Sequence, residues 1–128
     1  MPNDLNVLLL DDIETLHDIT KSYLKDVYEI YSAYTYDEAV ELIKTKGINF
    51  FHIFICDLYL QDKEKSGLSF ILKYLEGCKV IVVSGFLTKE IIDILIDHGV
   101  YAALRKPVHI DSLFVSMNSI IRCNKVII

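Results

Sequence analysis

The chain has 128 residues, of which 52% are hydrophobic and 24% are charged, and its formal net charge at pH 7 is −5. This length suits one domain with a sizeable core, and the composition excludes an intrinsically disordered chain. The acidic balance argues against direct nucleic-acid binding, because a phosphate backbone requires a basic face. No apolar run reaches the roughly 18 residues of a membrane span, and no cationic segment precedes the first apolar run as in a signal peptide.

Strand-like and helical patterns alternate in the first half of the chain. "LNVLLL" at 5–10 predicts a buried strand, and residues 13–27 repeat apolar side chains at helical spacing. The expected inner positions of this helix are Leu16, Ile19, Tyr23, Leu24 and Val27. "EIYSAY" at 29–34 predicts a second strand. Thr35 then begins a helix as the first residue of a capping box, and Gly47 ends it.

The same alternation continues to the end. "NFFHIFIC" at 49–56 predicts a third strand, followed by the polar loop "QDKEKSG" and a helix at 68–77. This helix has Leu68, Ile71, Leu72 and Leu75 on one side. The remaining elements are strands at 78–83 and 101–105 and helices at 88–98 and 110–124.

Five strands alternating with five helices predict the α/β class, with a parallel sheet between two layers of helices. We expect a single domain over residues 1–128, with its core at about 5–122. The tail at 123–128 ends in "VII". It is expected either to pack on the domain or to lead into a further module of the natural polypeptide.

Polar side chains follow the predicted strands at their carboxyl ends. Asp11 and Asp12 follow the first strand, Asp57 ends the third, Ser84 follows the fourth and Lys106 the fifth. These strand ends share one edge of a parallel sheet, so the strand order 2-1-3-4-5 would bring the three carboxylates into one crevice. Crowded carboxylates repel one another unless a cation lies among them, and oxygen ligands suit Mg²⁺. The alternative for the first two acids is simple capping of the following helix.

The segments "LLLDD", "FICD", "VVSG" and "LRKP" occur in this order, and with them the chain resembles the receiver domain of two-component response regulators from Leu5 to about Arg122. The resemblance implies a flavodoxin-like (βα)5 three-layer sandwich with the sheet order 2-1-3-4-5. It also implies that Asp57 accepts a phosphoryl group from a histidine kinase or a histidine phosphotransfer protein. The protein would catalyse its own phosphoryl transfer and dephosphorylation in the cytoplasm, and would not be a metabolic enzyme.

The resemblance also assigns the metal ligands. Asp12 would bind Mg²⁺ directly and Asp11 largely through water. Asp57 and the backbone carbonyl of Tyr59 would complete the protein ligands, which leaves the tyrosine side chain free.

Four further positions receive roles in the same way. Ser84 would donate a hydrogen bond to one phosphoryl oxygen, and Lys106 would pair with another. Gly85 would let its backbone approach the phosphoryl group. The peptide bond between Lys106 and Pro107 is expected to be cis.

The sequence departs from the family pattern at several positions. Ala103 stands where many receivers have an aromatic switch residue. The sequence leaves two alternatives: Tyr101, two residues earlier, shares the face of Ala103 and partly replaces the missing ring, or the usual aromatic coupling is absent. Gln61 replaces a common proline, and the glycine of this loop comes later, at Gly67.

Tyr59 and Phe86 flank the path of the attacking water in receivers. Two aromatic side chains there would shield an acyl phosphate and lengthen its life. The alternative is that they simply cover apolar surface at the sheet edge.

Receivers often bind effectors or dimerise through their last two helices and last strand. The expected partner surface is therefore formed by 88–98, 101–105 and 110–124. The first of these helices has more apolar residues than one inner stripe needs, so some must face outward or toward a neighbour. The three cysteines and four histidines show no metal-ligand spacing, which predicts reduced thiols and structural or surface histidines.

Two other functions compete with the phosphorylated receiver. The first is a receiver-like interaction module that works without phosphorylation. The second is an aspartyl phosphatase, which would need a second aspartate at the position of Tyr59. A flavodoxin-like cofactor carrier would need a hydroxyl- and glycine-rich loop after the first strand, where this chain has "DDIETL".

Overall fold

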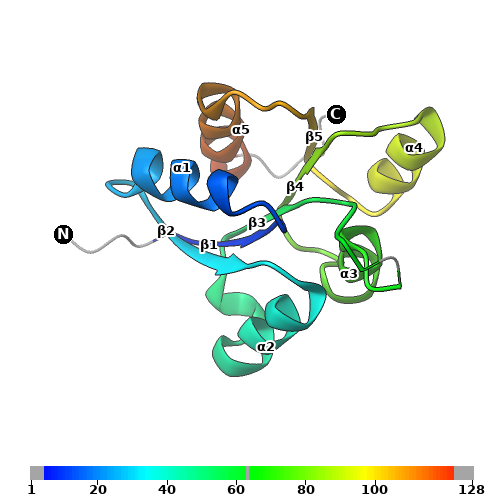
Figure 1. Ribbon diagram of the computed structural model, residues 1–128, viewed down its shortest axis with the longest axis horizontal. Helices are drawn as coiled ribbons and strands as arrows, with labels where there is room; N and C mark the ends of the chain where they lie inside the picture. Colours follow the sequence, from blue (N-terminus) through cyan, green and yellow to red (C-terminus); the bar gives the residue numbers. More distant parts are fainter. Residues whose placement is uncertain (1–4, 63, 123–128) are drawn as a thin grey trace.

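The computed structural model describes residues 5–62 and 64–122 and contains one parallel sheet in the order β2-β1-β3-β4-β5 (Figure 1). The strands are β1 (Leu5–Leu10), β2 (Tyr28–Ala33), β3 (Ile53–Cys56), β4 (Val80–Ser84) and β5 (Ala102–Arg105). Each is parallel to its neighbours; Leu8 of β1, for example, pairs with Tyr31 of β2 on one side and Phe54 of β3 on the other. The predicted class, alternation and strand order are confirmed.

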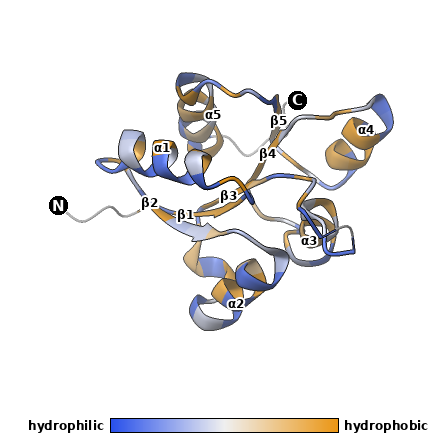
Figure 2. Ribbon diagram, in the orientation of Figure 1, coloured by the Kyte–Doolittle hydropathy of each residue, from blue (hydrophilic) through white to orange (hydrophobic). Residues whose placement is uncertain are grey.

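Helices cover both faces of the sheet. They are α1 (Glu14–Leu24), α2 (Tyr36–Lys46), α3 (Gly67–Tyr74), α4 (Lys89–Asp97) and α5 (Ile110–Arg122), with a short 3₁₀ helix at Ile48–Phe50. In Figure 1, α1 and α5 lie on one side of the sheet and α2 and α3 on the other. The core is accordingly split in two: α1 and α5 pack with Val7 and Leu9, and α2, α3 and α4 pack with Leu8 and Leu10. Because both faces are covered, the central strands β1, β3 and β4 are apolar apart from Asn6 and Ser84 (Figure 2).

The capping prediction for α2 is confirmed. The Thr35 side chain accepts a hydrogen bond from the backbone N–H of Glu38, and the Glu38 carboxylate in turn accepts one from the N–H of Tyr34. Gly47 closes the helix with a φ of 90°, a conformation that favours glycine.

The third strand is shorter than predicted, because it begins at Ile53 and not at residue 49. Phe50 and Phe51 instead pack edge-on against Tyr31, with ring centroids 5.3 and 5.7 Å away. His52 is exposed, and its ring accepts a hydrogen bond from the N–H of Asn6 at 3.0 Å. His52 still donates a backbone hydrogen bond to the carbonyl of Asn6 at 2.7 Å, so aromatic packing replaces strand pairing only at Phe50 and Phe51.

The inner face predicted for the first helix is wrong at three positions. Ile19, Tyr23 and Val27 are exposed. The buried residues of α1 are His17, Thr20 and Leu24. In α3, Leu72 is likewise exposed, and Phe70 is buried beside Ile71.

Two smaller predictions concern the cysteine thiols and membrane-spanning segments. Cys56 is buried, Cys78 is half-buried, and both are free thiols; Cys123 and the tail at 123–128 lie outside the described residues. Within the described ranges, no helix is both long enough and apolar enough to cross a membrane.

Candidate functional site

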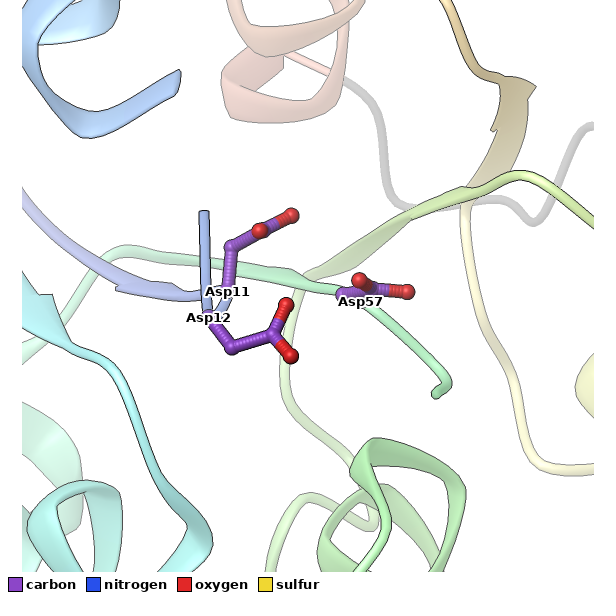
Figure 3. Close-up of side chains that lie close together, drawn as sticks. All are labelled: Asp11, Asp12 and Asp57. Carbon is purple, nitrogen blue, oxygen red and sulfur yellow. The ribbon is translucent and has the colours of Figure 1, made fainter. Parts of the chain in front are cut away.

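Three carboxylates meet at the carboxyl edge of the sheet. Asp11 and Asp12 follow β1 and Asp57 follows β3, and each offers one oxygen within 4.8 Å of the others (Figure 3). Asp11 and Asp57 are buried and Asp12 is half-buried. The donors are all carboxylate oxygens, which fits a hard divalent cation such as Mg²⁺.

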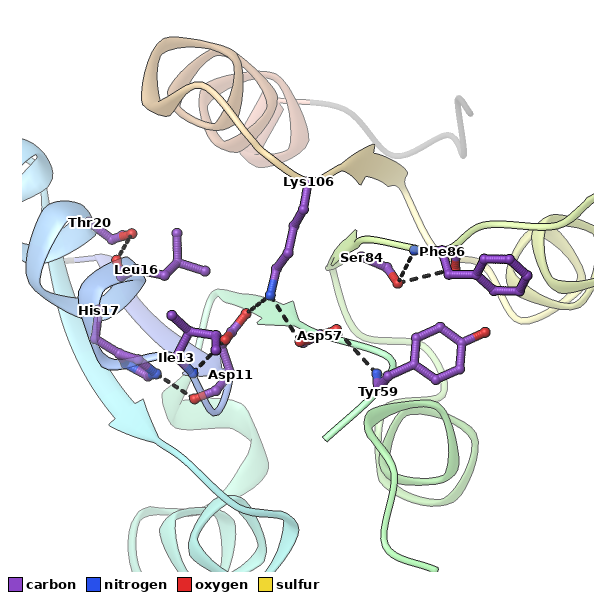
Figure 4. A network of polar contacts seen from close by, with 10 residues as sticks. All are labelled: Asp11, Ile13, Leu16, His17, Thr20, Asp57, Tyr59, Ser84, Phe86 and Lys106. Carbon is purple, nitrogen blue, oxygen red and sulfur yellow. Dashed lines mark hydrogen bonds and ion pairs between the residues drawn. The ribbon is translucent and has the colours of Figure 1, made fainter. Parts of the chain in front are cut away.

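Lys106 lies between two of these carboxylates. Its Nζ is 2.7 Å from Oδ2 of Asp11 and 3.0 Å from Oδ2 of Asp57 (Figure 4). Burial lowers the pKa of Lys106, but hydrogen bonds and attraction from the two aspartates outweigh it, so the net pKa is raised. The ammonium is therefore charged at neutral pH. The expected cis peptide bond between Lys106 and Pro107 is present.

Burial at the end of β3 makes the charged form of the Asp57 side chain unfavourable. Burial raises the pKa of Asp57, although the hydrogen bond from Lys106 and the N–H of Tyr59, which donates to Oδ1 at 3.1 Å, both oppose this rise. Desolvation is thus incompletely compensated by the protein alone. The charged carboxylate would gain from a further cation.

Backbone hydrogen bonds between neighbouring strand ends hold the acids together. The N–H of Asp57 donates to the carbonyl of Leu10 at 2.8 Å, and the N–H of Asp11 donates to the carbonyl of Ala33 at 3.1 Å. The parallel ladder therefore places both carboxylates before any ligand is present.

Ser84 and Gly85 lie at the end of β4. The Ser84 side chain is buried; its Oγ donates to the carbonyl of Phe86 at 3.2 Å and accepts from the N–H of Phe86 at 3.3 Å. A Cβ built on Gly85 would meet no atom within 4 Å, so the space beside this residue is empty of protein atoms. The β4–α4 turn is thus closed by the serine hydroxyl (Figure 4).

The structural role of Gly67 could not be predicted from the residue pattern. This residue is buried at the start of α3, and a Cβ built on it would lie 1.5 Å from the carbonyl oxygen of Asp57. The N–H of the next residue, Leu68, donates to the carbonyl of Leu58. The first turn of α3 therefore packs directly against the backbone that carries Asp57.

His17 is the second residue that sequence reasoning missed. His17 belongs to α1, and its ring is buried on the inner side of that helix. Nε2 is 2.7 Å from the carbonyl oxygen of Asp11, and Nδ1 is 2.7 Å from Oγ of Ser32. Burial lowers the pKa of His17, against the raising effect of its hydrogen bond to the Asp11 backbone. The only sequence signal is its spacing from Thr20 and Leu24 along the inner stripe of α1.

Tyr101 is not a substitute for an aromatic residue at position 103. Tyr101 packs with the core half that contains α1 and α5, whereas Ala103 packs with the other half. Tyr101 also precedes the first residue of β5, so the strand rule that residues two apart share a face does not apply to the pair.

Tyr59 and Phe86 lie close together to one side of Asp57 and Ser84, at the right of Figure 4. Their ring centroids are 6.2 Å apart at 60°, and the two residues are 43% and 61% exposed. The backbone N–H groups of these residues bind Asp57 and Ser84, so both rings project from positions fixed by the site.

Comparison with known proteins identifies the family. The family described as "response regulator receiver domain" matches residues 7–118. The chain therefore belongs to the response regulator receiver domains of two-component systems. A comparison with curated proteins gives no significant match.

Solved structures of receivers share the fold. A CheY-like receiver domain protein from Methanospirillum hungatei JF-1 is 26% identical with a TM-score of 0.80, covering 92% of this chain and 94% of that one. The receiver domain of a putative Luxo repressor protein from Vibrio parahaemolyticus is 27% identical with a TM-score of 0.78, covering 92% and 90%. A response regulator from Burkholderia pseudomallei, solved with a phosphorylated aspartic acid, a calcium ion and citrate, is 24% identical with a TM-score of 0.76, covering 93% and 69%.

The contact at Gly67 leads to a first prediction. Gly67→Ala should lower the free energy of unfolding by about 1–3 kcal/mol, because the new methyl group overlaps backbone that cannot move aside without shifting α3. Gly85→Ala, which meets open space, should change it by no more than about 0.5 kcal/mol. Urea unfolding of both variants measures the difference, and equal stabilities would contradict the packing described for α3.

The raised pKa of Asp57 leads to a second prediction. Between the ordinary carboxyl pKa and the raised one, the folded state binds more protons than the unfolded state, so stability falls as pH rises through this window. Asp57→Asn should therefore raise the free energy of unfolding at neutral pH in EDTA, and the gain should shrink as the pH is lowered through the window.

Urea unfolding over a pH series measures this effect. Asp37→Asn is the control, since the Asp37 side chain is 70% exposed and only pairs with Lys65 at the surface. A loss of stability at neutral pH in Asp57→Asn would show that the pairing with Lys106 outweighs burial.

Proposed function

We propose that this receiver accepts a phosphoryl group on Asp57, in a Mg²⁺-dependent reaction, from a histidine kinase or a histidine phosphotransfer protein. The observation that carries the proposal is the double contact of Lys106 with Asp11 and Asp57 beside the carboxylate of Asp12. The Burkholderia pseudomallei regulator, with its phosphorylated aspartic acid and calcium ion, supports it at the level of the fold.

Asp57, Lys106 and Ser84 would have separate roles in the phosphoryl transfer. A carboxylate oxygen of Asp57 attacks the phosphorus of the donor phosphohistidine; the P–O bond forms, the P–N bond breaks, and its electron pair returns to the donor imidazole. Lys106 is placed to pair with a phosphoryl oxygen, and the Ser84 hydroxyl is the candidate donor to another.

Mg²⁺ held by Asp11, Asp12, Asp57 and the backbone carbonyl of Tyr59 would neutralise the charge that gathers as the phosphoryl group arrives. The protein's part is to orient the acceptor and to keep two fixed negative groups beside it. A receiver-like module that works without phosphorylation would not need this complete set of acids together with Lys106.

Output would pass through the surface of α4, β5 and α5. Ile94 and Ile96 of α4 are exposed, and Val115 of α5 is 64% exposed. Apolar side chains at the surface of these helices suit an effector or a second receiver.

A phosphorylation assay tests the proposal. Incubation with acetyl phosphate and Mg²⁺ should add one phosphoryl group by intact mass, because the Asp57 side chain lies beside the Lys106 ammonium. Asp57→Asn should abolish the adduct, as should EDTA. An adduct that persists in Asp57→Asn, or its absence from wild-type protein that binds Mg²⁺, would contradict the proposal.

The rings of Tyr59 and Phe86 beside the site should set the lifetime of the phosphorylated state. Replacing Tyr59 and Phe86 together by Asn and Ser should speed phosphate loss about three- to tenfold, since water then reaches the acyl phosphate over a barrier lower by about 0.7–1.4 kcal/mol. Val115→Ser is the control, because that exposed side chain lies on α5.

Release of inorganic phosphate from the isolated phosphoprotein measures this rate. An unchanged rate in the double variant would mean that the two rings only cover surface at the sheet edge.

A further inference from the structure

A buried polar junction lies next to the turn after β1 that carries Asp11 and Asp12, here called the acidic turn. His17 of α1 contacts the backbone carbonyl of Asp11 and the hydroxyl of Ser32 on β2, both at 2.7 Å (Figure 4 shows the first of these). The ring of Tyr34 packs beside the imidazole with its centroid 4.2 Å away. The side chain is fully buried, yet both of its nitrogens have partners.

These partners fix the state of the imidazole. A backbone carbonyl can only accept a hydrogen bond, so Nε2 must carry a proton. In the neutral ring Nδ1 is then an acceptor, and the Ser32 hydroxyl donates to it. The contact with Asp11 is therefore a directed hydrogen bond from the side chain to the backbone.

The carbonyl that His17 holds belongs to the peptide between Asp11 and Asp12. The six atoms of a peptide unit are coplanar, so fixing its oxygen restricts the position of the Cα of Asp12. The N–H of Asp11 is already held by Ala33, and its Oδ1 accepts from the N–H of Ile13 at 2.8 Å. His17 supplies the remaining restraint on the turn.

We propose that His17 is a positioning residue of the metal site, which holds the Asp11–Asp12 peptide so that both carboxylates face a divalent cation. The inference rests on the proposed function, because it takes these aspartates as ligands. Groups that orient metal ligands from behind typically contribute 10- to 100-fold to metal affinity. His17 would do so through the backbone, without touching the cation.

Thr20 provides a matched control within the same helix. It is buried on the same face of α1 one turn later, but its hydroxyl donates to the carbonyl of Leu16 within the helix. A variant at Thr20 disturbs the packing of α1 and leaves the acidic turn alone.

The experiment is a calorimetric titration of the EDTA-treated protein with Mg²⁺, paired with urea unfolding in EDTA. His17→Leu should raise the Mg²⁺ dissociation constant about 10- to 100-fold, because the Asp11 carbonyl loses its donor. His17→Gln, whose amide N–H can donate to that carbonyl, should recover most of the affinity. Thr20→Val should lose stability and keep wild-type affinity.

The results distinguish the role of His17 from the proposed Mg²⁺-dependent phosphorylation of Asp57. Wild-type affinity in His17→Leu, or an equal loss in His17→Leu and Thr20→Val, overturns the role of His17 and leaves the proposed function standing. No Mg²⁺ binding by the wild-type protein overturns the proposed function and this inference together.

A second measurement needs no variant and decides the matter if His17→Leu does not fold. The imidazole ¹⁵N shifts of the wild-type protein report which nitrogen of His17 carries the proton. The Nε2–H form, with a coupling across the hydrogen bond to the Asp11 carbonyl carbon, supports the inference. The Nδ1–H form overturns it.

Discussion

Three carboxylates repel one another at the carboxyl edge of the sheet. Asp11, Asp12 and Asp57 carry three formal negative charges and Lys106 one positive charge, which leaves −2 at the edge of the sheet. Like charges this close favour protonation or separation of the groups. The parallel ladder prevents separation, because backbone hydrogen bonds hold the ends of adjacent strands side by side. A divalent cation would cancel the remaining charge, and an incoming phosphoryl group would then meet a site close to neutral.

The acids and the exposed aromatic rings of the site stand on different kinds of segment. The acids stand at or just past the ends of buried strands, where Gly67 and His17 support their backbone from opposite sides of the sheet. The exposed rings of Tyr59 and Phe86 stand in loops, and their backbone N–H groups are tied to the site. Such an arrangement lets the chemistry stay fixed while the loop side chains set the access of water and partners.

The convergence of the acids could be predicted from the sequence because it follows from topology. Once strands alternate with helices, all strand ends share one edge, and residues such as Asp57 and Lys106 come together without any knowledge of packing. The roles of His17 and Gly67 could not be predicted, because they depend on which side of α1 faces the sheet and on how closely α3 approaches β3. Apolar spacing alone placed Ile19 and Tyr23 inward, whereas the turn needs a buried hydrogen-bond donor on that face.

Ala103 removes the aromatic ring that many receivers use as a switch, and Tyr101 lies in the other half of the core. Under the proposed function, coupling between the site and α4 would use other contacts. The Ser84 hydroxyl closes the turn through Phe86, and a guanidinium nitrogen of Arg105 donates to the carbonyl of Leu87 at 3.1 Å. Under the proposed function, a phosphoryl oxygen that takes the Ser84 hydroxyl competes with the turn for it. Phosphorylation would then be linked to the conformation of the β4–α4 turn through one hydroxyl group, without an aromatic residue at position 103.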